Sequence, residues 1–229
     1  MNTKNPRKAV AALGEGTRLS DVAYARVFEL MYERKLPAGA FVSQSQLVEL
    51  TGVPLAPLRD ALRTLEAEGV LTIHPHSGIQ FVKPGLELTR STYQFRGIIE
   101  AAAVAVYAET AADEDIAELL QRHKDVEQIL ESEGLTSSAA AGLEDLETSL
   151  HGTIVASLNN PLIDTSYRRI RNYLKLLRLD RRMSAPLALR SVREHMAVLE
   201  ACRSHDAVAA VSAIQAHFAA ALQRNLGLY

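Results

Sequence analysis

The chain has 229 residues, of which 48% are hydrophobic and 23% charged, as is usual for a globular protein. This length suffices for one large domain or two ordinary ones, each with a buried core. A single cysteine, Cys202, excludes a disulfide framework within the chain and favours a reducing compartment. No uninterrupted apolar run approaches the roughly 20 residues of a membrane span. We therefore expect a cytoplasmic protein with no membrane association.

The charge of the chain is unevenly distributed. Residues 1–83 carry ten Lys and Arg against eight Asp and Glu, whereas residues 84–229 carry fifteen against nineteen. The N-terminal part is therefore the better partner for a polyanion, although a surplus of two charges also fits an ordinary solvated surface. The first stretch, MNTKNPRKAVAALGEG, is basic but lacks the apolar core of a signal peptide, so we expect residues 1–17 to be a disordered lead-in.

Three helices are predicted next. Residues 20–35 place apolar side chains at helical spacing and end at LPAG. A short helix begins at Ser43, where SQSQ has the form of a capping box, and it ends at Gly52. The third helix begins within VPLAPLRDAL (53–62) and continues to Gly69.

Two β-prone runs, VLTI and IQFV, then flank the turn HPHSG and predict a hairpin. Three helices followed by a hairpin form the outline of a winged helix-turn-helix, which we assign to residues 18–83.

The remainder of the chain is predicted to be helical. Residues 84–90 include Pro84 and Gly85 and are expected to form a linker. From residue 91 to residue 229 the pattern is almost wholly helical, and the short loops favour antiparallel neighbours. The expected fold is therefore mainly α: a winged helix-turn-helix with a small β-hairpin, then an all-α bundle of six to seven helices.

The order of these elements and several motifs resemble the GntR family of bacterial transcription regulators, in the branch with a FadR-type helical FCD domain. The resemblance covers about residues 18–226. The motifs are LPAGAFVSQSQLVELTGV, PLRDALRTLEAEGVLTI, the Gly78 wing, RGIIE (96–100), ETSLHGTIVASLNNPLI (147–163), EHMAVLEACRSHD (194–206) and AHF (216–218). This family resemblance implies a homodimer that binds a double-stranded DNA operator, most commonly as a repressor, under the control of a small effector.

The resemblance also implies which residues contact DNA, and here the chain departs from the family. In the family the recognition helix opens roughly Val-Ser-Arg-Thr-Pro-Val-Arg-Glu-Ala-Leu, whereas here Pro54, Leu55 and Ala56 replace Ser, Arg and Thr. Leu55 cannot bond guanine but can pack on a thymine methyl, and Arg59 is retained to hold a phosphate. The expected DNA-binding residues are Ser45, Leu55, Ala56, Arg59, His74, His76 and Gly78.

Two interpretations of this altered surface remain open. The protein binds a site richer in A·T contacts through Arg59, the wing and backbone amides, or it has lost tight DNA binding and keeps only the packing face. His74 and His76 also fit ordinary exposed turn residues.

A second group of residues points to a metal. Glu147 and His151 lie one helical turn apart and face the same way. By spacing alone such a pair is usually a surface pair or a satisfied core histidine. The resemblance implies that His151, His195 and His217 bind a divalent ion such as Zn²⁺, Ni²⁺ or Mn²⁺, with Glu147 in place of the family's Asp. The longer Glu147 side chain could bind directly or lie outside the ligand shell.

Further inferences concern the remaining polar residues. In proteins of this kind the arginine equivalent to Arg96 binds the carboxylate of a small organic acid, which suits the planar fork of a guanidinium. The alternative is a salt bridge with Glu100, four residues later. His123 and His205 are expected to face solvent.

Two rival functions are a metabolite- and metal-binding protein without specific DNA binding, and a metal-dependent enzyme. No nucleophile–base pair or acid–base carboxylate pair supports the enzyme.

Overall fold

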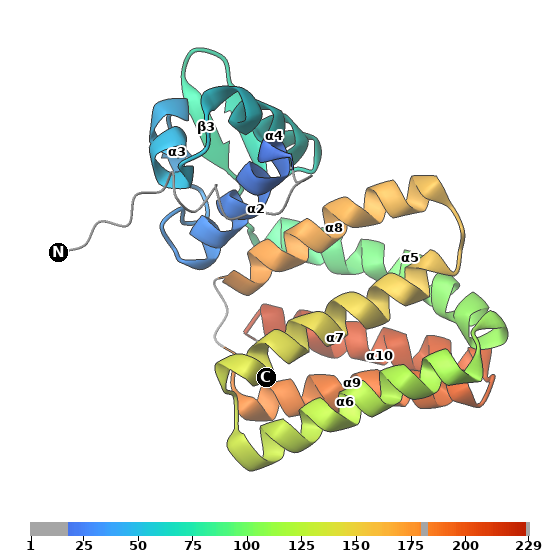
Figure 1. The fold of residues 1–229 in the computed structure, drawn as a ribbon. Helices are drawn as coiled ribbons and strands as arrows, with labels where there is room; N and C mark the ends of the chain where they lie inside the picture. Colours follow the sequence, from blue (N-terminus) through green and yellow to red (C-terminus); the bar gives the residue numbers. More distant parts are fainter. Residues whose placement is uncertain (1–17, 180–182, 228–229) are drawn as a thin grey trace. The chain divides into compact units, whose positions relative to one another are not determined.

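The structure is a computed structural model that describes residues 18–179 and 183–227 (Figure 1). The expected disordered lead-in, residues 1–17, lies outside the described residues. The chain divides into two compact units. The first runs to Gly85 and includes the stretch from Arg171 to the end of helix α8, and the second contains the other described residues.

The N-terminal unit contains three helices and a three-stranded antiparallel sheet of order β1-β3-β2. Its elements are α2 (Leu19–Tyr32), β1 (Phe41–Val42), α3 (Gln44–Thr51), α4 (Leu55–Ala67), β2 (Leu71–His74) and β3 (Gly78–Phe81). The predicted hairpin is β2–β3, with Ile73 opposite Ile79. The strand β1 was not predicted, and it pairs with β3 through Phe41 and Val42.

Local sequence explains where the helices of this unit begin and how they pack. The predicted capping box is confirmed: Oγ of Ser43 accepts the Gln46 N–H at 3.2 Å, and Oε1 of Gln46 accepts the Ser43 N–H at 2.8 Å. Leu58, Leu62 and Leu65 recur at helical spacing along α4 and are buried in the core. The opposite face of α4 is left for solvent or a ligand.

The C-terminal unit is helical, as predicted. Its elements are α5 (Leu86–Thr110), α6 (Asp113–Glu133), α7 (Ser137–Ala156), the part of α8 (Pro161–Leu179) before Arg171, α9 (Ala185–Arg203) and α10 (Ala207–Asn225). Figure 1 shows α10 lying along α5 and α9, α6 along α9, and α7 along α5. None of the helices in the described ranges has both the length and the apolar character needed to cross a bilayer.

Two boundaries in the structure differ from those predicted. The linker expected at 84–90 is shorter, because α5 begins at Leu86, directly after Pro84 and Gly85, and no breaker follows. The stretch of α8 from Arg171, which the prediction includes in the C-terminal domain, groups with the first compact unit. There Leu176 is buried in the N-terminal core and Nδ2 of Asn172 donates to Glu68 at 2.8 Å.

Candidate functional site

Three helices of the C-terminal unit bring the predicted metal ligands together. Glu147 and His151 come from α7, His195 from α9 and His217 from α10. One potential ligand atom from each residue lies within 4.8 Å of every other. Each of the three histidines is at most 3% exposed, because each occupies an inward-facing position of its helix. Helical spacing placed only Glu147 and His151 together, and the family resemblance added His195 and His217; the packing of the bundle brings these residues to one point.

The histidines present unsatisfied nitrogens to this cluster. The Nε2 atoms of His151, His195 and His217 are buried, and each lacks a hydrogen-bond partner among the described residues. Unsatisfied buried polar atoms are rare in proteins because they cost free energy, so three that converge form a group of donors that a ligand could satisfy. A divalent cation fits this donor set, since imidazole nitrogens with one carboxylate suit Zn²⁺ and related ions.

The opposite nitrogens of two rings are held by carboxylates. Nδ1 of His151 lies 2.6 Å from Oε2 of Glu100, and Nδ1 of His217 lies 2.9 Å from Oε2 of Glu194. An ionised carboxylate only accepts hydrogen bonds, so both Nδ1 atoms carry the proton. In the neutral rings the lone pairs are therefore on Nε2 and face the cluster, which is the arrangement that metal-binding histidines commonly adopt.

Burial keeps two of the rings in the neutral form that a metal requires. It lowers the pKa of His195 well below its usual value, and the neighbouring imidazoles of His217 and His151 lower it further. Burial also lowers the pKa of His217, although its hydrogen bond to Glu194 acts in the opposite direction. Both lowered pKa values favour the neutral ring, which carries a single N–H and leaves the other nitrogen free to bind a cation.

The Glu147 carboxylate lies between the histidines and an arginine. Its Oε1 is 3.6 Å from Nε2 of His151 and 3.2 Å from Nη1 of Arg96, while Oε2 is 3.5 Å from Nε2 of His195. The extra methylene of Glu relative to Asp thus leaves the carboxylate within reach of the cluster while it contacts Arg96.

Arg96 forms the predicted alternative salt bridge, within a wholly buried network. Its Nε donates to Oε1 of Glu100 at 2.6 Å, and the hydroxyl of Tyr167 donates to the same oxygen at 2.9 Å. Burial raises the pKa of the Glu100 carboxyl, but Arg96 and His151 outweigh it and bring that pKa below its usual value. One donor nitrogen of Arg96, Nη2, is buried without a partner among the residues described.

A second arginine secures the far side of the cluster. Arg224 makes a two-pronged pair with Glu194, at 2.7 and 2.6 Å, and Glu194 also holds His217. Burial raises the pKa of Glu194, but the hydrogen bonds from His217 and Arg224 bring it to about 2. Glu194 therefore stays ionised and keeps the His217 ring oriented. This pair could not be predicted from the sequence, because residues 194 and 224 meet only through helix packing.

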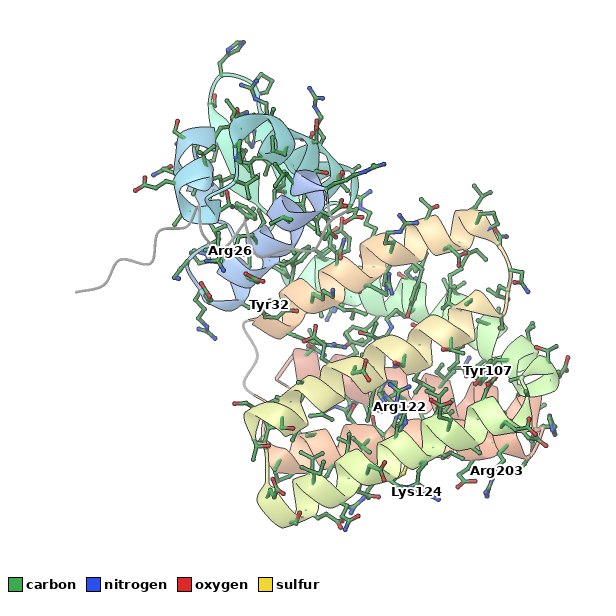
Figure 2. All side chains as sticks on the ribbon, viewed as in Figure 1. Arg26, Tyr32, Tyr107, Arg122, Lys124 and Arg203 are labelled. Carbon is green, nitrogen blue, oxygen red and sulfur yellow. The ribbon has the colours of Figure 1, made fainter. Side chains whose placement is uncertain are left out.

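The expectation that His123 faces solvent was wrong. Figure 2 shows its charged neighbours Arg122 and Lys124 on α6; Lys124 is exposed, while Arg122 donates to Ser149 on α7 at 3.0 Å. His123, which stands between these two residues in the sequence, is fully buried, and its Nε2 lies 3.3 Å from Nδ1 of His195. The burial of His123 could have been predicted from helical periodicity, because it lies seven residues from both Ile116 and Leu130, which are buried on the same helix.

His205, by contrast, is largely exposed, as expected. Its ring pairs with Asp113 at 3.2 Å and takes no part in the cluster.

The predicted DNA-contact residues of α3 and α4 lie on exposed faces. Ser45, Leu55, Ala56 and Arg59 are all exposed. Pro54 stands at the N-cap of α4 and makes no side-chain cap bond. Nε of Arg59 donates to Oε1 of Gln44 at 3.0 Å, which holds the guanidinium at the surface between the first turns of α3 and α4.

The wing residues have different surroundings. His76 is exposed with a φ of 60°, whereas His74 bonds Oε1 of Gln80 at 3.2 Å and packs on the ring of Phe41, 5.7 Å away. Phe41 is 55% exposed and was not predicted to contribute to the surface. The contact of Phe41 with the wing could not be read from the sequence, because it depends on the unpredicted strand β1.

These features together define a class of protein: a winged helix-turn-helix unit joined to a helical bundle with a buried polar centre. Residues 91–220 match the FCD domain family, and residues 19–81 match the bacterial regulatory proteins of the gntR family. The chain therefore belongs to the GntR family and is a transcription regulator with an FCD effector-binding domain, not an enzyme.

One curated relative and several solved structures are similar to this chain. The chain is similar to an uncharacterized HTH-type transcriptional regulator, YdhC of Bacillus subtilis, with 21% identity over 200 residues and 85% of each chain covered. Its fold is similar to that of McbR/YncC of E. coli, with a TM-score of 0.71, 17% identity, and 93% of this chain and 99% of the other covered. It also resembles the metal-free FCD domain of TM0439, with a TM-score of 0.52, 22% identity, and 64% and 99% covered.

Proposed function

We propose that this regulator binds operator DNA as a homodimer in the cytoplasm and that its bundle holds a divalent metal together with a small organic-acid effector. In this proposal the effector controls the affinity for DNA, with repression as the commoner outcome in the family. The observation that carries the proposal is the convergence on one point of a carboxylate and three buried Nε2 atoms that have no hydrogen-bond partner among the described residues. A divalent ion there would supply a positive charge and open positions for an oxygen ligand.

Arg96 supports the assignment of the effector as an acid. Its free Nη2 offers a donor inside the unit that carries the metal cluster, and a guanidinium recognises carboxylates through paired hydrogen bonds. The Glu100 salt bridge does not oppose this role, because it fixes the guanidinium while Nη2 stays unsatisfied. The effector would act on DNA binding only if its affinity differed between the DNA-competent and DNA-incompetent states.

The metal is tested by elemental analysis of the purified chain. We expect the wild type to carry a stoichiometric divalent ion of the Zn, Ni or Mn class and His195→Ala to lose most of it, because one of the converging nitrogens is removed. His205→Ala is the matched control, since His205 is an exposed histidine outside the cluster. Equal metal content in wild type and His195→Ala, with both folded by circular dichroism, contradicts the site.

The DNA surface combines a kept scaffold with a reduced set of polar contacts. Arg59 is exposed on α4 and positioned by Gln44, and Leu55 is 39% exposed where it could meet a thymine methyl. We propose that the unit binds a site richer in A·T contacts through Arg59 and the wing. The alternative, a unit that has lost tight DNA binding, predicts no retardation of DNA at any salt concentration.

Gel-shift titration against the chain's own promoter region decides between the two. We expect retardation that weakens steeply with salt, and a salt slope smaller by about 1 for Arg59→Ala, because one phosphate contact is lost. Arg26→Ala serves as control: Arg26 lies on α2 of the same unit and is held by Glu29 at 2.6 Å (Figure 2). Identical slopes for Arg59→Ala and wild type exclude Arg59 as a phosphate contact.

A further inference from the structure

The candidate ligand His195 differs from the other two in its hydrogen-bond partner. Its Nδ1 lies 3.3 Å from Nε2 of His123, a residue of α6, and both rings are buried. His151 and His217 are each held by a carboxylate instead. Among the three histidines of this site, His195 is therefore the one whose ring is held by another imidazole.

The hydrogen bonds of His123 fix the position of its proton. Nδ1 of His123 lies 2.7 Å from the carbonyl oxygen of Leu119, one turn earlier on α6. A carbonyl oxygen only accepts, so Nδ1 of His123 is the donor. A neutral imidazole with its proton on Nδ1 has its lone pair on Nε2, so Nε2 of His123 is the acceptor. The hydrogen bond between the rings therefore runs from Nδ1 of His195 to Nε2 of His123.

This direction determines the state of the other His195 nitrogen. With the proton on Nδ1, neutral His195 has its lone pair on Nε2, the atom 3.5 Å from Oε2 of Glu147. The opposite tautomer would place two unprotonated nitrogens 3.3 Å apart and leave the proton on Nε2, where a metal would bind. Electrostatic repulsion between the two lone pairs disfavours that tautomer in a buried site.

We propose that His123 is a positioning residue for metal binding, which holds His195 in the tautomer whose Nε2 lone pair faces the metal ligands. This inference rests on the metal centre proposed above. A neutral imidazole orients the ligand without adding negative charge beside the ion, unlike the carboxylates behind His151 and His217. His123 is thus a determinant of metal affinity that lies outside the ligand set.

The tautomer is measured first, on the full-length metal-free protein. Long-range ¹H–¹⁵N correlation spectra distinguish the two neutral tautomers, and the His195 signals are identified by their absence from His195→Gln. We expect the Nδ1-protonated tautomer for both His123 and His195 in the wild type. The Nε2-protonated tautomer of His195 in the wild type overturns the proposal, whatever the behaviour of any variant.

Zinc affinity is measured next, by competition with a chromophoric chelator. His123→Met fills the same space with a flexible apolar side chain and leaves only a weak thioether acceptor, so we expect zinc binding about 10–100-fold weaker, as for other supporting residues of metal sites. His123→Gln places an amide oxygen near the former Nε2 and should restore affinity to within about fivefold of wild type, because that oxygen accepts from Nδ1 of His195. His205→Gln is the control for loss of a histidine outside the cluster.

The outcomes separate this inference from the metal site itself. If the wild type binds no zinc, the metal centre fails, and the wild-type tautomer still decides the role of His123. If the wild type binds zinc and His123→Met binds it equally well, the metal centre stands and the role of His123 is refuted. Equal losses in His123→Met and His123→Gln also refute it, because they indicate a packing effect rather than a lost acceptor.

Discussion

At the scale of single residues, Gly78 shows how a missing side chain shapes the wing. Its φ is 155°, and a Cβ there would lie 2.8 Å from Cε1 of Phe41 and 2.9 Å from the carbonyl oxygen of Val42. Real Cβ atoms do not approach backbone so closely, so strand β1 could not pair with β3 as it does. Glycine is therefore required here by contact with a neighbouring strand as well as by the turn.

Gly78→Ala is expected to destabilise the wing by about 1–3 kcal/mol, because the strands must separate to admit the methyl group. Hydrogen exchange of the β2 and β3 amides in the full chain would then be roughly 5–150-fold faster, by the usual conversion of free energy to a rate ratio. Ser77→Ala, at an exposed neighbouring position, should change these rates little. Unchanged exchange in Gly78→Ala would show that the strands yield without cost.

For single residues of the site, the candidate ligands could be predicted from the sequence, but the residues that support them could not. Helical spacing paired Glu147 with His151, and the family resemblance added His195 and His217. Their supporting residues were missed because their contacts join distant parts of the chain: 51 positions separate His151 from Glu100, and 72 separate His195 from His123. Spacing along one helix carries no information on such contacts.

At the scale of elements, helix positions followed from local rules. The capping box at Ser43 and the left-handed Gly52, with a φ of 70°, delimit α3 as predicted. Strand β1 was missed because two residues show no alternation and form a strand only by pairing with β3.

Helix α8 shows a further limit of pattern reading. Its apolar positions indicated a buried face but not which core receives it, and Leu176 lies in the N-terminal core. The partner of an apolar face is settled by tertiary structure, so the domain boundary could not be drawn from periodicity alone.

At the scale of the whole molecule, the proposed homodimer makes a simple prediction. A two-fold assembly would present two winged units to a palindromic site. Light scattering of the purified full chain should give a mass twice that of one chain across a range of concentrations. A single-chain mass at all concentrations, including those at which DNA is retarded, would contradict the dimer.

The Glu100 carboxylate contacts both Arg96 and His151, so two binding events share one buried group. An acid that draws the guanidinium away would alter how firmly the imidazole is held, and an ion on that imidazole would in turn alter the pull on the arginine. Thermodynamic reciprocity requires each to change the affinity of the other by the same factor. Under the proposed function, the concentration of the organic acid at which the regulator responds would therefore depend on how much metal the cell has in supply.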